Sequence, residues 1–340
     1  MIFEDSISYF FFIFIFNFLL LAKINWIAKK INVYDEPDNS RKIHHTSTPL
    51  LGGFIIFVNF LAFSLFFFMF DINVLIDSFR ISEVMTVIFF VIICSIIFLI
   101  GFYDDTYSIS SKTRLLILSL IVYFFIYVVD ISQINSLNFL SIQETLELKK
   151  LKILFPSFCI LILMISCNLY DGINFQSFLF YMINFCFLYY LNQNSFILMI
   201  IISLLFFGFL NFNGKVFLGE SGVYLLSFIL GYCFIICFNY QFKLIYADQI
   251  FLFLLFPVLD SIRVFVLRLI KNKNIFTPDQ SHFHHIIIKK VGYLKSVFIL
   301  LFFNLIPIFS YFYSLNPAII SILFILLYSS ILFFSKTIKI

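Results

Sequence analysis

Two adjacent aspartates, Asp104 and Asp105, stand at the end of an uncharged apolar run from Val84 to Phe102. A carboxylate pair repels itself and is costly beside hydrocarbon, so it needs a cation or a chemical task. The alternative is that the pair only ends a helix in the hydrated headgroup layer of a membrane. The pair alone does not separate these two interpretations, so the other polar residues must decide.

Oxygen-bearing side chains recur in later loops. Asn168, Asp171 and Asn174 lie close together in the sequence, and Glu220 lies between two glycines. Taken singly, the segment at Asp171 is a helix-ending turn and the segment at Glu220 a flexible connector. Several carboxylates meeting at one surface would repel each other, and Mg²⁺ relieves this with oxygen ligands while it keeps waters for phosphate groups. The donor set as a whole therefore favours Mg²⁺, with Mn²⁺ as an alternative ion.

A histidine cluster, His282, His284 and His285, lies near the C-terminal end. Histidines at this spacing suit either a transition metal or hydrogen bonding to phosphate or sugar. No cysteine accompanies them, so contact with an anion or a sugar is favoured. Histidines without a task in a surface loop remain the alternative.

The composition places these residues in an integral membrane protein. The chain of 340 residues is 62% hydrophobic and 12% charged, whereas a soluble domain carries about 25% charged residues. A formal net charge of +4 without a compact basic segment does not indicate nucleic-acid binding. We expect a single all-α, polytopic membrane domain over 1–340, with about eleven transmembrane helices. The expected spans are 6–22, 50–70, 84–103, 114–129, 153–169, 175–191, 195–210, 222–239, 248–270, 296–313 and 317–335.

The distribution of positive charge predicts the orientation of these spans. Of the 22 Lys and Arg, only five fall on the side of the even-numbered loops, namely Arg80, Lys149, Lys150, Lys152 and Lys243. The positive-inside rule then puts the N-terminus outside and the C-terminus and the odd loops in the cytoplasm. These loops carry every candidate residue named above. We expect them to form one cytoplasmic site from the segments near 23–49, 104–113, 170–175, 211–221 and 271–295.

Two further groups have structural alternatives. Arg41, Lys42 and His44 form a basic patch in the first loop that suits substrate contact, although positive charge is ordinary in a cytoplasmic loop. Asp260 and Arg263 are three residues apart on one expected span. At this spacing they can neutralise each other as an intramembrane pair, which is the favoured interpretation.

Five segments in order resemble a known family, the polyprenyl-phosphate N-acetylhexosamine-1-phosphate transferases. They are Asp-x-Pro-x3-Arg-Lys-x-His-x4-Pro-x2-Gly-Gly (35–53), Gly-Phe-Tyr-Asp-Asp (101–105), Asn-Leu-Tyr-Asp-Gly (168–172), Phe-Leu-Gly-Glu-Ser-Gly (217–222) and Asp-x2-His-Phe-His-His (279–285). The resemblance runs from about residue 35 to 290.

The resemblance implies an enzyme that moves a sugar 1-phosphate from a UDP-sugar to undecaprenyl phosphate and releases UMP. Asp104 or Asp105 would deprotonate or position the lipid phosphate, and Asp171 would act as a nucleophile or as an orienting group. Glu220, with Asp171, would bind Mg²⁺. Substrate contacts would come from the asparagines, the basic patch and the histidines, namely Asn168, Asn174, Arg41, Lys42, His44, His282, His284 and His285.

Differences within the family bear on the substrate. The His-x-His-His spacing resembles the branch that uses UDP-N-acetylglucosamine, whereas the phospho-N-acetylmuramoyl-pentapeptide transferases resemble three contiguous histidines. The chain departs from the family pattern at Glu220, where Asp is usual, at Ile165, where Asn is frequent, and at Phe175, where Gly is usual. A transporter or a non-catalytic scaffold is the rival hypothesis, but transporters place polar groups near the midplane. The sequence leaves a homodimer open.

Overall fold

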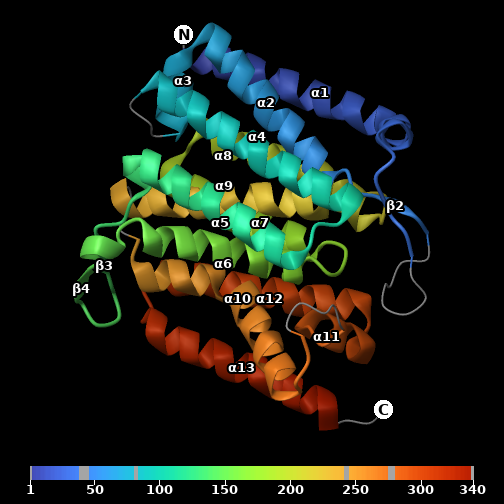
Figure 1. Cartoon of the computed structure of the whole chain (residues 1–340), viewed down its shortest axis with the longest axis vertical. Coiled ribbons are helices and arrows are strands. Elements are labelled where there is room, and N and C mark those ends of the chain that lie inside the picture. The colour runs from blue at the N-terminus through green and yellow to red at the C-terminus, as the bar shows by residue number, and fades with distance from the viewer. Residues whose placement is uncertain (1, 38–45, 80–82, 241–244, 275–279, 338–340) are drawn as a thin grey trace.

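The computed structural model describes residues 2–37, 46–79, 83–240, 245–274 and 280–337. Long helices stack from α1 and α2 at the top of Figure 1 to α13 at the bottom, and most run across the page. The helices are α1 Ile2–Ile31, α2 Gly52–Phe70, α3 Ile72–Phe79, α4 Val84–Tyr107, α5 Ser111–Val128, α6 Leu154–Tyr170, α7 Gln176–Asn192, α8 Ser195–Phe212, α9 Gly219–Tyr240, α10 Ala247–Ile270, α11 Phe283–Val291, α12 Tyr293–Phe312 and α13 Pro317–Thr337. Two antiparallel strand pairs are β1 Tyr34–Asp35 with β2 Thr48–Pro49, and β3 Ser136–Asn138 with β4 Thr145–Glu147.

The expected helical class is confirmed, and each of the eleven expected spans corresponds to a helix. Within the described ranges, nine helices are long and apolar enough to cross a membrane. Helices α6 and α7 have 17 residues each, which is at the lower limit for a span. The short helices α3 and α11 were not predicted, because each has fewer than ten residues and no apolar run of its own.

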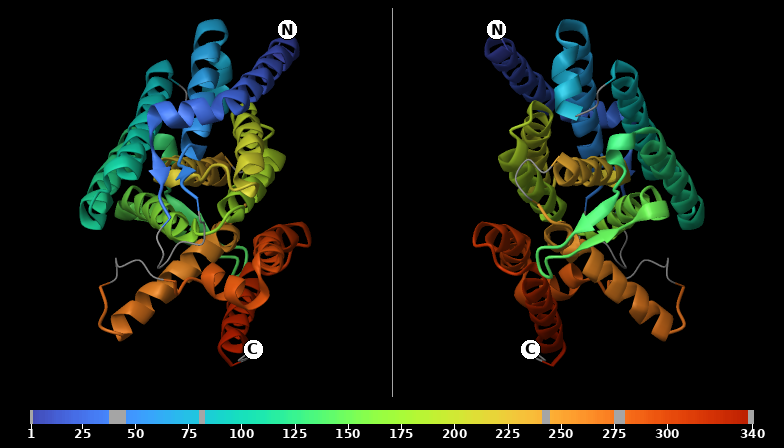
Figure 2. Two further views of the ribbon diagram at one scale, coloured as in Figure 1. Left: turned by 90° about the vertical axis from the view of Figure 1, so that its right-hand side faces the viewer. Right: turned by 90° about the vertical axis from the view of Figure 1, so that its left-hand side faces the viewer.

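Helix α9 is the centre of the bundle. All of its most hydrophobic window is buried inside the protein, and α2, α4, α6 and α7 pack around it. Figure 2 shows this gold helix enclosed by its neighbours. A helix that is apolar on every side is expected to be buried, and here α9 supplies the surface on which the others assemble.

Glycines allow the N-terminal end of α9 to approach two other helices closely. A Cβ at Gly53 of α2 would lie 2.3 Å from the backbone N of Gly222, and one at Gly101 of α4 would lie 2.4 Å from Cα of Ser221. Small residues at crossings let helix backbones come together in membranes. Hydrogen bonds from Gly52 N to Phe217 O and from Gly53 N to Leu218 O reinforce this close packing.

The loops alternate between the two ends of the bundle. The β1–β2 pair and α11 lie on the right of Figure 1, and the β3–β4 hairpin lies on the left. The connections on the side of β1–β2 and α11 carry the candidate carboxylates, namely Asp104 near the end of α4, Asp171 after α6 and Glu220 at the start of α9. Which end faces the cytoplasm stays a prediction.

Adding a methyl group at the α4–α9 crossing should destabilise the protein. We expect Gly101→Ala to lower the free energy of unfolding by about 1–3 kcal/mol, because backbone atoms of α9 cannot move aside as a flexible side chain can. Thermal unfolding followed by circular dichroism measures the effect. Gly231→Ala on α9 is the matched control, since its new Cβ would meet only the side chain of Ile160. Equal melting temperatures for the two variants would contradict this account of the crossing.

Candidate functional site

Two carboxylates from different helices share one arginine. Arg114 Nη1 donates to Asp104 Oδ2 at 2.8 Å and to Glu220 Oε2 at 2.7 Å. The hydroxyl of Tyr224 also lies between them, 2.6 Å from Glu220 Oε2 and 3.4 Å from Asp104 Oδ2. The Asp104 side chain is 3% exposed and that of Glu220 is 32% exposed. A buried carboxylate and a partly open one are thus held together by a single cation.

The turn from α4 to α5 brings this arginine to the carboxylates. Asp104 Oδ1 accepts a hydrogen bond from Ile109 N at 2.6 Å, which closes the turn. Ser110 then caps α5 by accepting from Thr113 N at 3.2 Å. Arg114 follows in the first turn of α5 and so faces back toward α4. Neither Arg114 nor Tyr224 was predicted, although a basic residue at the mouth of a span ten residues after Asp104 was a usable signal.

Asp105 has a different task from its neighbour. Its two carboxylate oxygens accept hydrogen bonds from the backbone N–H groups of Glu220, at 2.7 Å, and Ser221, at 3.1 Å. These groups are at the N-terminal end of α9, where unpaired N–H groups and the helix dipole favour a negative charge. Gly219 begins the helix at φ +76°, and a Cβ there would lie 2.7 Å from Asp105 Oδ2. Asp105 therefore fixes the start of α9 and, with it, the position of Glu220.

Asp171 is the fourth carboxylate of this end. It follows the last residue of α6 and accepts a hydrogen bond from Ser177 Oγ at 2.6 Å through Oδ1. Burial raises the pKa of Asp171 to about 6, the Ser177 hydrogen bond opposes this, and the negative charge of Asp35 adds to it. A carboxylate whose pKa lies near neutral pH can accept a proton under working conditions.

Of the two predicted asparagines, Asn168 is linked to the carboxylates and Asn174 contacts α12. Asn168 Nδ2 donates to the Tyr224 hydroxyl at 3.3 Å, which in turn contacts Glu220. The main-chain oxygen of Asn174 accepts from the Tyr293 hydroxyl at 3.3 Å. Asn168 thus joins the α6 end to the α9 end of the site through one phenol.

The histidine segment is anchored by the intramembrane pair of α10. The expected contact between Asp260 and Arg263 is confirmed at 2.7 Å. Asp260 also contacts Nδ1 of His282 at 2.8 Å and accepts from Phe283 N at 3.1 Å. Tyr328 donates to Asp260 at 2.6 Å. Asp260 therefore accepts a hydrogen bond from the first backbone N–H of α11 and orients His282, in addition to neutralising Arg263.

His284 joins this segment to the Asp171 turn. The His284 ring lies so close to Gly172 that a Cβ on that glycine would be 2.0 Å from Nε2. Burial holds the pKa of His284 well below its usual range, and the neighbouring His285 lowers it further, so the ring is neutral. Its Nδ1 lies 3.3 Å from Gln176 Nε2, and its buried Nε2 has no hydrogen-bond partner among the described residues. The His285 ring lies 4.3 Å from that of His284.

Arg41, Lys42 and His44 lie outside the described residues, so their substrate contacts stay predictions. Ser177, Gln176 and Tyr328 join the site without having been predicted. Each is an ordinary polar residue in an apolar helix, and no spacing in the sequence sets it apart from a packing residue.

The residues present suit Mg²⁺ by chemical type. Asp171 Oδ2 and Glu220 Oε1 accept no hydrogen bond from the described residues and are hard oxygen donors. No group of three or more His, Cys, Asp or Glu in the described part of the chain could hold a metal by itself. Mg²⁺ is commonly bound by one or two carboxylates together with substrate phosphates. The donor set therefore fits an ion that arrives with a phosphate substrate, and not a closed protein cage.

The fold and the site together define a membrane-embedded helical protein with a carboxylate–arginine site at one end of the bundle. The family model of glycosyl transferase family 4 matches residues 85–238, the segment that carries Asp104, Asp105, Asp171 and Glu220. Over that segment the chain is similar to this family.

Named relatives cover most of the chain. It is 29% identical over 297 residues to the undecaprenyl-phosphate alpha-N-acetylglucosaminyl 1-phosphate transferase of Thermotoga maritima, over 86% of this chain and 85% of that protein. It is 27% identical to the probable undecaprenyl-phosphate N-acetylglucosaminyl 1-phosphate transferase of Bacillus subtilis, over 76% and 70%. It is 22% identical to the undecaprenyl-phosphate alpha-N-acetylglucosaminyl 1-phosphate transferase of Salmonella typhi, over 85% and 78%. The predicted family resemblance is confirmed.

Arg114 and Glu220 should be energetically coupled. We expect Arg114→Gln and Glu220→Gln each to destabilise the protein, and the double variant to be about 1–2 kcal/mol more stable than the sum of the single effects. The reason is that the double variant leaves one unpaired carboxylate, Asp104, whereas Arg114→Gln alone leaves two that repel each other. Denaturant unfolding of the four proteins in one detergent measures the coupling. Strict additivity would show that the 2.7 Å contact carries no coupling energy.

Gln176 should fix the tautomer of His284. Because Gln176 Nε2 donates to Nδ1, the ring proton belongs on Nε2. ¹⁵N NMR of histidine-labelled protein, assigned with His284→Asn, should show the Nε2–H form. Gln176→Glu should move the proton to Nδ1, since a carboxylate accepts from it, and Gln176→Met should give a mixture. An Nδ1–H ring in the unmodified protein would contradict this assignment.

Proposed function

We propose that the protein transfers an N-acetylhexosamine 1-phosphate from a UDP-sugar to undecaprenyl phosphate and releases UMP. The single observation that carries this proposal is the Asp104–Arg114–Glu220 cluster at the end of an apolar span, within a family whose named relatives act on undecaprenyl phosphate. Such a cluster offers a cation and bases to a phosphate whose hydrocarbon tail stays in the bilayer. The reaction would begin a lipid-linked surface glycan such as O-antigen, teichoic acid or a polymer like enterobacterial common antigen.

The chemistry is a phosphoryl transfer. An oxygen of the lipid phosphate attacks the sugar-bearing phosphorus of the UDP-sugar, a new P–O–P link forms, and the bond to the UMP phosphate breaks. Catalysis of this kind depends on positioning and charge stabilisation. Arg114, now paired with two carboxylates, is placed to exchange one of them for a phosphate oxygen. Asp104, its partner, would position or deprotonate the lipid phosphate.

Asp171 and Asp105 take separate parts in this proposal. Asp171 would be the nucleophile of a two-step reaction or the orienting group of a one-step reaction, and its pKa of about 6 suits either. Asp105 is a positioning residue, because both of its oxygens hold the N-terminus of α9. Glu220 and Asp171 would hold Mg²⁺, which when bound neutralises the pyrophosphate.

The substrate sugar follows from the histidines. His282, whose Nδ1 faces Asp260, and His284, whose Nε2 is unpaired among the described residues, would contact the sugar nucleotide. The His-x-His-His spacing favours UDP-N-acetylglucosamine over a muramoyl-pentapeptide donor. The proposal also places this end of the bundle in the cytoplasm of a bacterial plasma membrane, following the positive-inside rule.

The transfer assay uses the full chain in membranes with radiolabelled UDP-N-acetylglucosamine, undecaprenyl phosphate and Mg²⁺. We expect labelled lipid that disappears with EDTA. Asp104→Asn and Asp171→Asn should each lower the rate by at least about 100-fold, since each removes a group that acts on the reacting phosphates. Glu220→Asp should retain or increase activity, because it restores the family's usual residue.

Glu147→Gln on the opposite hairpin is the matched control, since this exposed carboxylate lies in β4 and should leave the rate unchanged. UDP-N-acetylgalactosamine and the UDP-muramoyl-pentapeptide serve as competing donors. Folded protein that yields no labelled lipid from any donor would overturn the enzyme proposal and leave a scaffold. Labelling from the pentapeptide alone would reassign the chain to peptidoglycan synthesis.

A further inference from the structure

A cavity lies away from the carboxylates. It has a volume of about 510 Å³ and is lined by Leu140, Tyr190, Tyr246, Gln249, Tyr311, Phe312, Ser314 and Asn316. These residues come from the β3–β4 hairpin, the end of α7, the start of α10 and the α12–α13 turn, so the cavity is at the hairpin end of the bundle (Figure 1). Its volume is within the range of about 300–1,000 Å³ that is typical of small-molecule sites. It takes no part in the chemistry proposed above.

The lining contains phenols, amides and a hydroxyl, but no charged side chain. Asp248, which precedes the lining residue Gln249 in the sequence, already has hydrogen-bond partners. Its Oδ1 accepts from Leu140 N at 3.2 Å, and its Oδ2 accepts from Ser141 N at 2.8 Å and from Ser141 Oγ at 2.5 Å. A charged ligand would lose hydration there without gaining a counter-charge. The cavity therefore selects against phosphates and ions and favours a neutral ligand.

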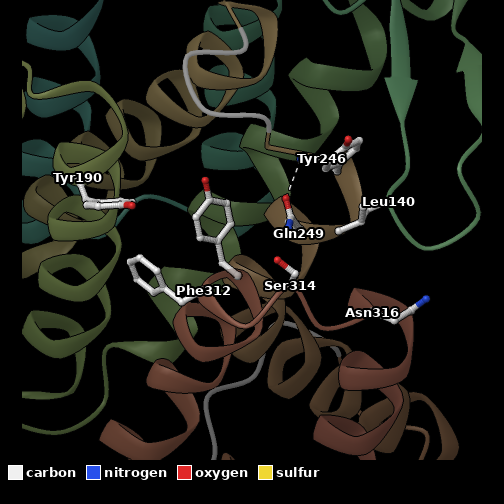
Figure 3. Close-up of a pocket in the computed structure, with 8 residues that line it drawn as sticks. Leu140, Tyr190, Tyr246, Gln249, Phe312, Ser314 and Asn316 are labelled. Atoms are coloured by element: carbon white, nitrogen blue, oxygen red, sulfur yellow. Dashed lines mark hydrogen bonds between the residues drawn. The ribbon is translucent and has the colours of Figure 1, made fainter.

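Gln249 presents a donor to this cavity. The residue is only 6% exposed, and its Oε1 accepts from Tyr246 N at 3.0 Å. Its Nε2 donates to none of the described residues, and in Figure 3 the nitrogen end of the side chain points into the space beside Ser314. This amide nitrogen is therefore a donor that is available to an oxygen atom of a ligand.

The remaining walls of the cavity are aromatic side chains, against which a ligand ring can stack. The Tyr190 and Phe312 rings are 5.1 Å apart, and Tyr311 is held edge-on against Phe187 at 4.9 Å. Tyrosine combines an apolar face with a polar tip. A sugar ring has the matching pattern, with C–H groups on its faces and hydroxyls around its edge.

The cavity is held open by hydrogen bonds between its walls. Ser141 Oγ donates to Asp248 of α10 and accepts from Ala318 N of α13 at 3.0 Å. Asn316 Nδ2 reaches Ser141 O at 3.4 Å. The hairpin, α10 and α13 are thus joined around the space before any ligand arrives, as is usual for small-molecule sites.

We propose that this cavity binds a neutral, hydroxyl-rich ring, that is, a sugar, at the end of the bundle opposite the carboxylates. The sugar could be free in solution or the headgroup of a glycolipid in the adjacent leaflet. Both sources share the same chemistry, so the binding experiment must separate them. This site goes beyond the proposed transfer reaction and does not depend on it.

The test is equilibrium binding to the full chain in phosphatidylcholine nanodiscs. One arm titrates N-acetylglucosamine followed by saturation-transfer NMR, the second adds monoglucosyl diacylglycerol to the discs, and the third titrates inorganic phosphate as a charged probe. Gln249→Glu keeps an acceptor for Tyr246 N but replaces the donor with a negative charge. We expect it to weaken binding at least about tenfold while the transfer rate stays unchanged.

Tyr311→Phe removes a lining hydroxyl without removing the ring, and should weaken binding even if Gln249→Glu does not fold. The control is Tyr313→Phe, a change at a neighbouring tyrosine that is 71% exposed and outside the lining. Binding in the first arm identifies a free sugar, and binding in the second arm alone identifies a glycolipid. Absence of both at millimolar ligand, binding of phosphate in their place, or equal affinity in all three variants would overturn the proposal.

Discussion

The capped N-terminus of α9 is the constraint on which the site depends. This helix is buried on all sides, so its first N–H groups have no access to bulk water and need a protein acceptor. Asp105 supplies both oxygens from α4. The backbones of α2, α4 and α9 meet where Gly53, Gly101 and Gly222 have no side chains. Because Glu220 is the residue whose N–H is capped, the position of its carboxylate is fixed by the same contacts that assemble the bundle. One aspartate therefore connects helix packing to the arrangement of charge at the membrane surface.

Charge balance explains why the adjacent aspartates have diverged in role. Asp105 is neutralised by the positive end of a helix, whereas Asp104 is neutralised by Arg114, which it shares with Glu220. A helix terminus cannot leave its carboxylate without unfolding a turn. An arginine side chain can rotate away, and its planar group suits phosphate as well as carboxylate. Exchange of ligands is thus available at Asp104 and not at Asp105. Asp260 resembles Asp105 in this respect, because its buried carboxylate also accepts from the N-terminus of a helix, α11, in addition to contacting Arg263 and Tyr328.

The sequence was sufficient for the helices and for placing Asp104, Asp171 and Glu220 at connections at the same end of the bundle, because long apolar runs and alternating loops determine both. The sequence could not identify the residues that contact these carboxylates. Arg114 was counted only as loop charge, and Tyr224 is one tyrosine among 18. Their importance comes from a contact between residues 106 positions apart, which no local pattern contains.

The Asp171 turn shows how tertiary contacts override local preference at a functional position. Phe175 has φ +71°, a left-handed conformation that costs a non-glycine residue about 1–2 kcal/mol. Its ring stacks on Phe178 at 4.5 Å and meets Phe212 edge-on at 5.2 Å, and aromatic pairs of this kind contribute about 0.5–1.5 kcal/mol each. Its N–H donates to Asn211 at 2.6 Å. These contacts offset the strain, so a bulky residue can occupy a position where the family pattern has glycine. The conformation of residues 172–175, which places Asp171 beside Ser177 and Gly172 against His284, is therefore imposed by α7 and α8 and not by the turn itself. Backbone strain that is held by the surrounding structure is common beside reactive groups. Here the strained backbone at Phe175 distinguishes this turn from the unstrained helix end that the Asp-Gly sequence alone would form.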